Sequence, residues 1–213
     1  MKKICFFIFS MVFLLLSEVS AQGDKQAEAV VDKLLQLMKI DAVSADFVLT
    51  INDKSLPQPQ VLKGDFTLKG NKLRMETEEI AVFFDGKTQW LYMAQNEEVS
   101  ITEPDEQEIT DINPMAILHN FRAKSSVRFA EKAPSDANYY IDITPKNTKE
   151  DIEKIELALN KNNNSVVYIK QKNKNGGTMS LQLKNFKSGV KVPDNVFVFD
   201  KSKYPNAEIN DLR

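Results

Sequence analysis

The 213-residue sequence holds few of the side chains on which metal sites and nucleophilic enzymes depend. It has one cysteine and one histidine. A zinc site takes several His or Cys ligands. A Ser-His-Asp triad would have to use His119, and the chain has no Gly-x-Ser-x-Gly turn around a serine. The composition therefore argues against zinc and triad chemistry, and we expect neither a metal nor a cofactor.

The single cysteine, Cys5, lies in a stretch that has the pattern of a secretory signal peptide. Two lysines precede an apolar run that is too short to span a bilayer, and Ala21 ends a small-residue cleavage site. An uncleaved membrane anchor is the weaker alternative, because no stop-transfer charges follow. A lipoprotein signal would have a cysteine at the cleavage point, where this chain has Gln22. We expect residues 1–21 to be a signal peptide cleaved after Ala21, and residues 22–213 to be one exported domain without disulfides.

Basic residues are not gathered into a block. The chain has 28 Lys and Arg and 30 Asp and Glu, which are interspersed. Without a Lys/Arg block, nucleic acid is not expected as a partner. The acidic stretch 103–111 lacks the alternating ligands and central glycine of a calcium loop, so we interpret it as solvated. An Asp/Glu glycosidase pair remains open, but the carboxylates mostly alternate with apolar residues along strands, and we expect no enzyme.

Apolar residues show the period of a helix near the N-terminus and the period of a strand afterwards. Residues 24–41 repeat apolar side chains every three or four positions, which predicts an amphipathic helix. Asn113 and Pro114 are typical first residues of a second, short helix. From Val43 onward roughly ten or eleven alternating segments follow, through a last strand at 196–199. The patterns predict a mainly β domain with two or three helices, in which an incomplete antiparallel β-barrel, or curved sheet, carries a helical lid.

The centre of this pattern is a predicted hairpin over residues 80–92. Asp85-Gly86 is a strong turn signal, because glycine adopts positive φ without a Cβ clash. On the second strand Trp90 and Tyr92 share one face and Leu91 the other, so both faces carry large apolar groups. Such a strand suggests a sheet that is covered on one side and encloses something on the other.

The hairpin also carries a family resemblance. Its motif Asp85-Gly86-Lys87-Thr88-x-Trp90-x-Tyr92 resembles the central motif of the LolA family, periplasmic chaperones that carry lipoproteins to the outer membrane. Further matching features follow in order along the chain: the N-terminal helix, Gly64-x-Phe66-x-Leu68 with Leu73-Arg74, Asn113-Pro114, Ile141-x-Ile143-x-Pro145, Phe197-x-Phe199 and Pro205. The resemblance covers essentially the whole of residues 22–213.

The resemblance implies a function and partners. It implies an apolar cavity that holds lipoprotein acyl chains without a cofactor, in a monomer in the periplasm of a diderm bacterium. The donor would be an inner-membrane lipoprotein-releasing ABC transporter, and the acceptor an outer-membrane protein that is LolB-like or of another kind. Gly70 lies where the family tends to have an arginine that latches the lid, so no latch residue is carried over. The alternative is an envelope sensor or lipid-binding module of the same fold that binds a protein partner or another lipid.

The prediction of a cavity rests on apolar residues that alternate along the curved strands and so share one face of the sheet. For any single one of these residues, ordinary packing in a solid core is the simpler alternative. The residues predicted to form the acyl-chain cavity wall are Phe47, Leu49, Phe66, Leu68, Leu73, Met75, Trp90 and Tyr92. The residues predicted to form the lid are Met115, Leu118 and Phe121.

Overall fold

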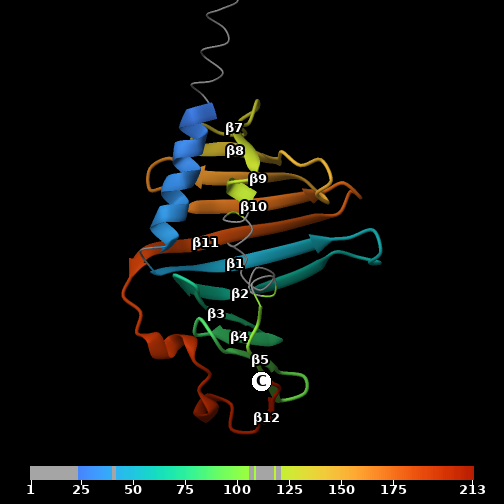
Figure 1. Ribbon diagram of the computed structural model, residues 1–213, viewed down its shortest axis with the longest axis vertical. Helices are drawn as coiled ribbons and strands as arrows, with labels where there is room; N and C mark the ends of the chain where they lie inside the picture. Colours follow the sequence, from blue (N-terminus) through green and yellow to red (C-terminus); the bar gives the residue numbers. More distant parts are fainter. Residues whose placement is uncertain (1–23, 40–41, 106–107, 109–117, 119–120) are drawn as a thin grey trace, which may run out of the picture.

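A computed structural model describes residues 24–39, 42–105, 108, 118 and 121–213 (Figure 1). The predicted signal peptide lies outside these residues, and so does Met115 of the predicted lid. In the described part of the chain, no helix has the length and apolar character needed to cross a membrane.

Most of the described chain is β-strand, as the alternating pattern predicts. The strands are β1 (Ala42–Asn52), β2 (Gln60–Lys69), β3 (Lys72–Thr77), β4 (Ile80–Phe84), β5 (Gln89–Met93), β6 (Glu98–Thr102), β7 (Ser125–Phe129), β8 (Asn138–Pro145), β9 (Ile152–Asn160), β10 (Val166–Asn173), β11 (Thr178–Val190) and β12 (Glu208–Asp211). Two short 3-10 helices, η1 (Asp194–Phe197) and η2 (Lys201–Lys203), lie between β11 and β12.

All these strands form one open sheet in the order β12-β6-β5-β4-β3-β2-β1-β11-β10-β9-β8-β7. Two runs of sequential antiparallel hairpins, β1 to β6 and β7 to β11, meet where β1 pairs with β11. The pairing of β12 with β6 is parallel. Because β7 and β12 lie at opposite edges (Figure 1), the sheet is open, which confirms the prediction of a mainly β, curved and unclosed antiparallel sheet.

The tail departs from the prediction of a strand at 196–199. Here η1 begins after Pro193, and the Val196 N–H donates to the Pro193 carbonyl at 3.2 Å. This turn uses the backbone groups locally, so the segment does not join the ladder, and Phe197 is buried instead. The strand that the tail does form is β12, whose four residues are all exposed and lack an apolar pattern.

One α-helix of several turns is present among the described residues, over 24–39, where two or three helices were predicted. It lies across the strands on one side of the sheet (Figure 1). Its apolar stripe is buried there: Ala27, Val31 and Leu34 belong to the main core cluster together with Phe66 of β2. The second predicted helix falls mostly outside the described residues, although Leu118, Phe121 and Arg122 are helical.

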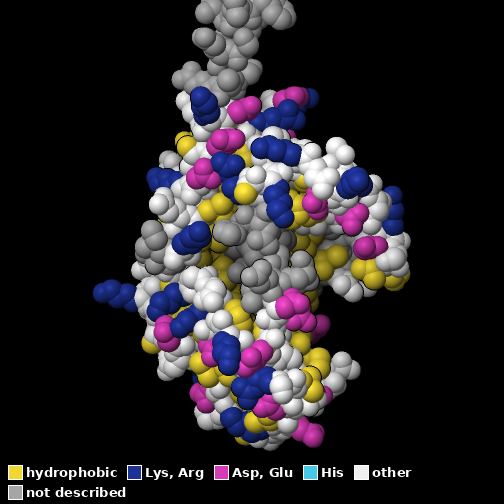
Figure 2. Space-filling view, viewed as in Figure 1, with side chains coloured by type: hydrophobic (Ala, Val, Ile, Leu, Met, Phe, Trp, Pro, Cys, Tyr) yellow, Lys and Arg dark blue, Asp and Glu magenta, His cyan; other side chains and the backbone are white. Residues whose placement is uncertain are grey.

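We call the side of the sheet that carries this helix the inner face and the opposite side the outer face. Residues that lie directly opposite each other on antiparallel strands have their side chains on the same face of the sheet. The register therefore assigns the residues of each strand to the inner or the outer face. Phe66 pairs with Ala45 and Met75, and Leu49 pairs with Leu62 and Leu181. The same parity continues through β10, β9 and β8 to Val127 of β7. The inner face is therefore apolar from β5 to β7, and Figure 2 shows hydrophobic side chains on both sides of the centre of this view.

The outer face has a smaller apolar cluster that the tail covers. Val99, Ile101 and Ala207 are buried there, and four aromatic side chains pack against them: Trp90, Tyr92, Phe199 and Tyr204. Phe83 of β4 joins this group, with ring centroids 6.0 Å from Phe199 and 6.4 Å from Tyr204. We call this group the tail cluster, because residues 197–207 close it from outside.

Candidate functional site

Six of the eight residues predicted to form the cavity wall lie together on the inner face. Phe47, Phe66, Leu68 and Leu73 are at most 5% exposed, and Leu49 and Met75 are half-buried against the same core cluster. The rings of Phe47 and Phe66 lie with centroids 6.3 Å apart. Position 64, directly opposite Phe47, is a glycine, where a Cβ would lie 1.9 Å from the Glu76 carbonyl oxygen, so no larger residue fits there. Whether these residues line a cavity stays a prediction.

The structure does not bring Trp90 and Tyr92 together with the other six. They belong to the tail cluster on the outer face, where the ring centroids of Tyr92 and Tyr204 are 4.5 Å apart. Register explains the placement, because Trp90 lies opposite Phe83 whereas Leu91 lies opposite Val82. Leu91 is the residue of β5 that packs on the inner core.

The described part of the predicted lid lies against the inner face. Leu118 is fully buried in the main cluster and Phe121 packs on it. Arg122 ties this segment to the N-terminal helix: its Nε and Nη2 donate to the Asp32 carboxylate at 2.7 and 2.9 Å. The hydrogen bonds that Arg122 donates to Asp32 raise the pKa of Arg122, and the charges of Asp32 and Glu28 add to the increase.

Two polar atoms are buried without a hydrogen-bond partner among the described residues, Gln89 Oε1 and Ser125 Oγ. Both belong to the inner face by register, since Gln89 lies opposite Phe84 and Ser125 has the parity of Val127. Leaving a buried acceptor unpaired costs about 1–3 kcal/mol. An occupant of this face could remove that cost by donating to them.

The ion-paired charged residues of β2 and β3 lie on the outer face. Arg74 of β3 forms ion pairs with Asp65 and Glu76. Partial burial would lower the pKa of Arg74, but hydrogen bonds and the charges of the two carboxylates outweigh it and raise the pKa. Among the described residues no group of three or more His, Cys, Asp or Glu could hold a metal ion. What the inner face offers is apolar contact, worth about 0.8 kcal/mol for each buried methylene.

Sequence reasoning missed the contribution of the second run of strands to this face. Leu157, Ile169 and Leu181, from β9, β10 and β11, extend the same cluster beyond β1. Their alternating pattern was visible, but their alignment with Leu49 depends on the pairing of β1 with β11, about 130 residues away in the chain. No local signal indicates that pairing.

The fold defines a class of proteins in which one open, curved antiparallel sheet carries a helix across an apolar face. The particular family follows from the sequence: the family model described as "Outer membrane lipoprotein carrier protein LolA" matches residues 38–200. The chain belongs to the LolA family. No curated protein matches it.

The chain is similar to several solved structures at low sequence identity. An uncharacterized conserved protein from Thermus thermophilus has a TM-score of 0.56 at 10% identity, over 87% of this chain and 99% of that one. MucB has a TM-score of 0.50 at 9% identity, over 84% of this chain and 64% of its own. A LolA superfamily protein from Nitrosomonas europaea has a TM-score of 0.41 at 14% identity, over 82% and 98%. At such identities the likeness concerns the fold alone.

Proposed function

We propose that the protein is a periplasmic carrier that holds the acyl chains of lipoproteins against the inner face of its sheet. In this proposal it receives them from an inner-membrane ABC transporter and passes them to an outer-membrane acceptor. Family membership supports a lipoprotein-binding role in the cell envelope. The observation that carries the proposal is the continuous apolar inner face, which ten neighbouring strands of the sheet, from β5 to β7, present as a single surface.

The half-buried members of the inner face are the best candidates for cargo contact. Leu49, Met75 and Leu91 pack against the core yet keep part of their surface free. Acyl chains laid on them would bury methylenes without a covalent step, and release would need only a competing apolar surface.

A pair of substitutions on neighbouring residues of β1 tests the proposal. Leu49 is half-buried on the inner face, whereas Val48 is half-buried on the outer face. Leu49→Asp should weaken binding of a fluorescent triacylated lipopeptide about tenfold or more, because a carboxylate would then meet the acyl chains. Val48→Asp is the matched control and should bind as the unmodified protein does. Circular dichroism and thermal melting establish that both variants are folded.

The outcomes separate the proposed carrier from other members of the fold. Native mass spectrometry of the purified protein should show bound lipid or lipoprotein, and Leu49→Asp should lose it. Equal binding by both variants would contradict the use of the inner face. Co-purification of a second protein, with no lipid bound, would favour the alternative in which the fold recognises a protein partner.

A further inference from the structure

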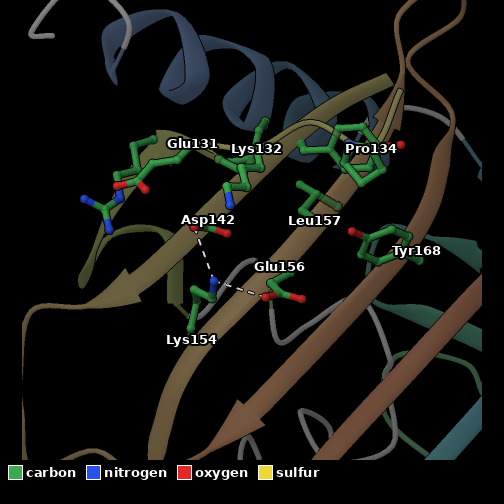
Figure 3. Close-up of a pocket in the computed structure, with 12 residues that line it drawn as sticks. Glu131, Lys132, Pro134, Asp142, Lys154, Glu156, Leu157 and Tyr168 are labelled. Carbon is green, nitrogen blue, oxygen red and sulfur yellow. Dashed lines mark hydrogen bonds and ion pairs between the residues drawn. The ribbon is translucent and has the colours of Figure 1, made fainter. Parts of the chain in front are cut away.

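A pocket of about 440 Å³ opens on the outer face at the end of the sheet away from the tail. Its floor is formed by β8, β9 and β10, and residues 130–134, after β7, form one wall (Figure 3). The N-terminal helix lies on the opposite side of these strands, so the pocket and the proposed acyl-chain surface are separated by the sheet. Pockets that bind small molecules have volumes of about 300–1,000 Å³.

One part of the pocket is an aromatic platform. Tyr140 and Tyr168 both lie opposite Ala158, which is fully buried beneath them. Their ring centroids are 6.4 Å apart with the planes at 43°. The Tyr140 hydroxyl lies 3.2 Å from both Ser135 Oγ and Asn138 Nδ2, which hold that ring in place. The small alanine leaves room for the rings, and together they present a surface to the pocket.

The other part is a row of charges of both signs. Lys154 Nζ lies 3.3 Å from Asp142 and 3.0 Å from Glu156, and Figure 3 shows these contacts across the floor. Lys172 adds a second contact to Glu156 at 2.6 Å. Burial would raise the pKa of Glu156, but the hydrogen bonds and charges of the two lysines outweigh it and lower the pKa. Glu156 therefore stays ionised, and Lys154 holds the Asp142 and Glu156 side chains in fixed positions.

Two cations at the rim are free to meet a ligand. Arg128 and Lys132 line the pocket, and neither forms an ion pair with another described residue. Arg128 lies directly opposite Asp142 in the β7–β8 pairing, and Lys132 points toward the same carboxylate in Figure 3. The site thus offers unused N–H donors beside fixed carboxylate acceptors.

This arrangement discriminates among classes of ligand. An anion would meet Asp142, Glu156 and Glu131 as well as the cations, so a phosphate gains little. A peptide that binds by adding a strand needs a free sheet edge, and β8, β9 and β10 each have a strand on both sides. A neutral, hydroxyl-rich ligand can donate to the carboxylates and accept from Arg128 and Lys132, while its apolar ring faces stack on tyrosine. We propose that this pocket binds a short neutral oligosaccharide.

The proposal is tested by NMR titration of the folded protein with tetra-N-acetylchitotetraose and, separately, with cellotetraose. At least one of them should shift the Ala158 methyl and Tyr168 ring resonances at millimolar concentration. Tyr168→Ala should weaken that binding about tenfold or more, because the stacking surface is lost. Tyr168→Phe keeps the ring and should bind within about threefold of the unmodified protein. Lys184→Ala, exposed on the outer face of β11, is the control and should bind unchanged.

Three results would overturn the proposal: no shift with either sugar, sugar shifts that persist in Tyr168→Ala, or binding of inorganic phosphate or an acidic tetrapeptide in place of the sugars. Binding of the triacylated lipopeptide is measured in the same Tyr168 variants. It should not change, because the pocket lies on the other face. The two proposals can therefore fail independently.

Discussion

On the inner face one apolar cluster extends from β7 to β5, whereas the apolar core cluster of the outer face is the smaller tail cluster. The inner cluster draws on both runs of hairpins, on the N-terminal helix and on Leu118. The tail cluster draws on β4, β5 and β6 and is closed by residues 197–207. The comparison indicates that the inner face holds the strands from β5 to β7 together, and that the outer cluster fastens the tail to one end of the sheet.

The largest expected effect comes from breaking the inner cluster at its centre. Phe66 is fully buried and lies beside Phe47. Phe66→Ala should lower the free energy of unfolding by about 3–5 kcal/mol, through lost burial and the cavity left behind. Urea denaturation followed by circular dichroism measures the change. Val61→Ala, at a position 52% exposed on the same strand, is the control and should change it by less than about 0.5 kcal/mol.

A smaller effect is expected from breaking the tail cluster. Tyr204 has ring centroids 4.5 Å from Tyr92 and 5.0 Å from Phe199. Tyr204→Ala should lower the free energy of unfolding by about 1–3 kcal/mol, since these ring contacts and part of a half-buried side chain are lost. Trp90 is the single tryptophan of the chain and lies in this cluster, so its fluorescence should shift to longer wavelength.

The same variant sharpens the assignment of the two faces. Tyr204→Phe keeps the rings and should preserve both stability and the fluorescence maximum. Lipopeptide binding should be unchanged in Tyr204→Ala, because the tail cluster lies on the outer face. Weaker binding in this variant would place Trp90 and Tyr92 back among the residues that contact cargo.

Much of the fold was predictable because each local pattern has one structural solution. The helix at 24–39 follows from its three- and four-residue apolar spacing, and the β4–β5 hairpin from Asp85-Gly86, whose glycine has φ of 103°. The alternation of side chains along a strand correctly placed Trp90 and Leu91 on opposite faces of β5. It could not say which of the two faces inward, because that depends on the partner strand, where Phe83 lies opposite Trp90.

The tail was the least predictable part of the fold. Residues 196–199 alternate Val and Phe like a strand, yet η1 buries Phe197 in a turn. β12 has no apolar pattern and is held by its parallel pairing with β6. The candidate oligosaccharide pocket was equally hidden, because Arg128, Asp142, Glu156 and Tyr168 look like solvated positions on four separate strands until the register places them side by side.

The smallest expected effect concerns the ion pairs that hold the start of the tail. Asp194 accepts from Lys69 and Lys72 at 2.7 Å each, and these two lysines lower its pKa from 3.8 to about 2. A carboxylate whose pKa is depressed by folding stabilises the protein above its unfolded pKa, and this contribution is lost as the pH falls from about 4 to about 2. Asp194→Asn should therefore lower the melting temperature at pH 6 and make little difference near pH 2. The difference at pH 6 should shrink in high salt, because Asp194 is 61% exposed.

Asp136→Asn, on an exposed loop in the other half of the sheet, is the matched control. An equal shift for Asp194→Asn at both pH values would show that the lysines do not act through the charge of Asp194.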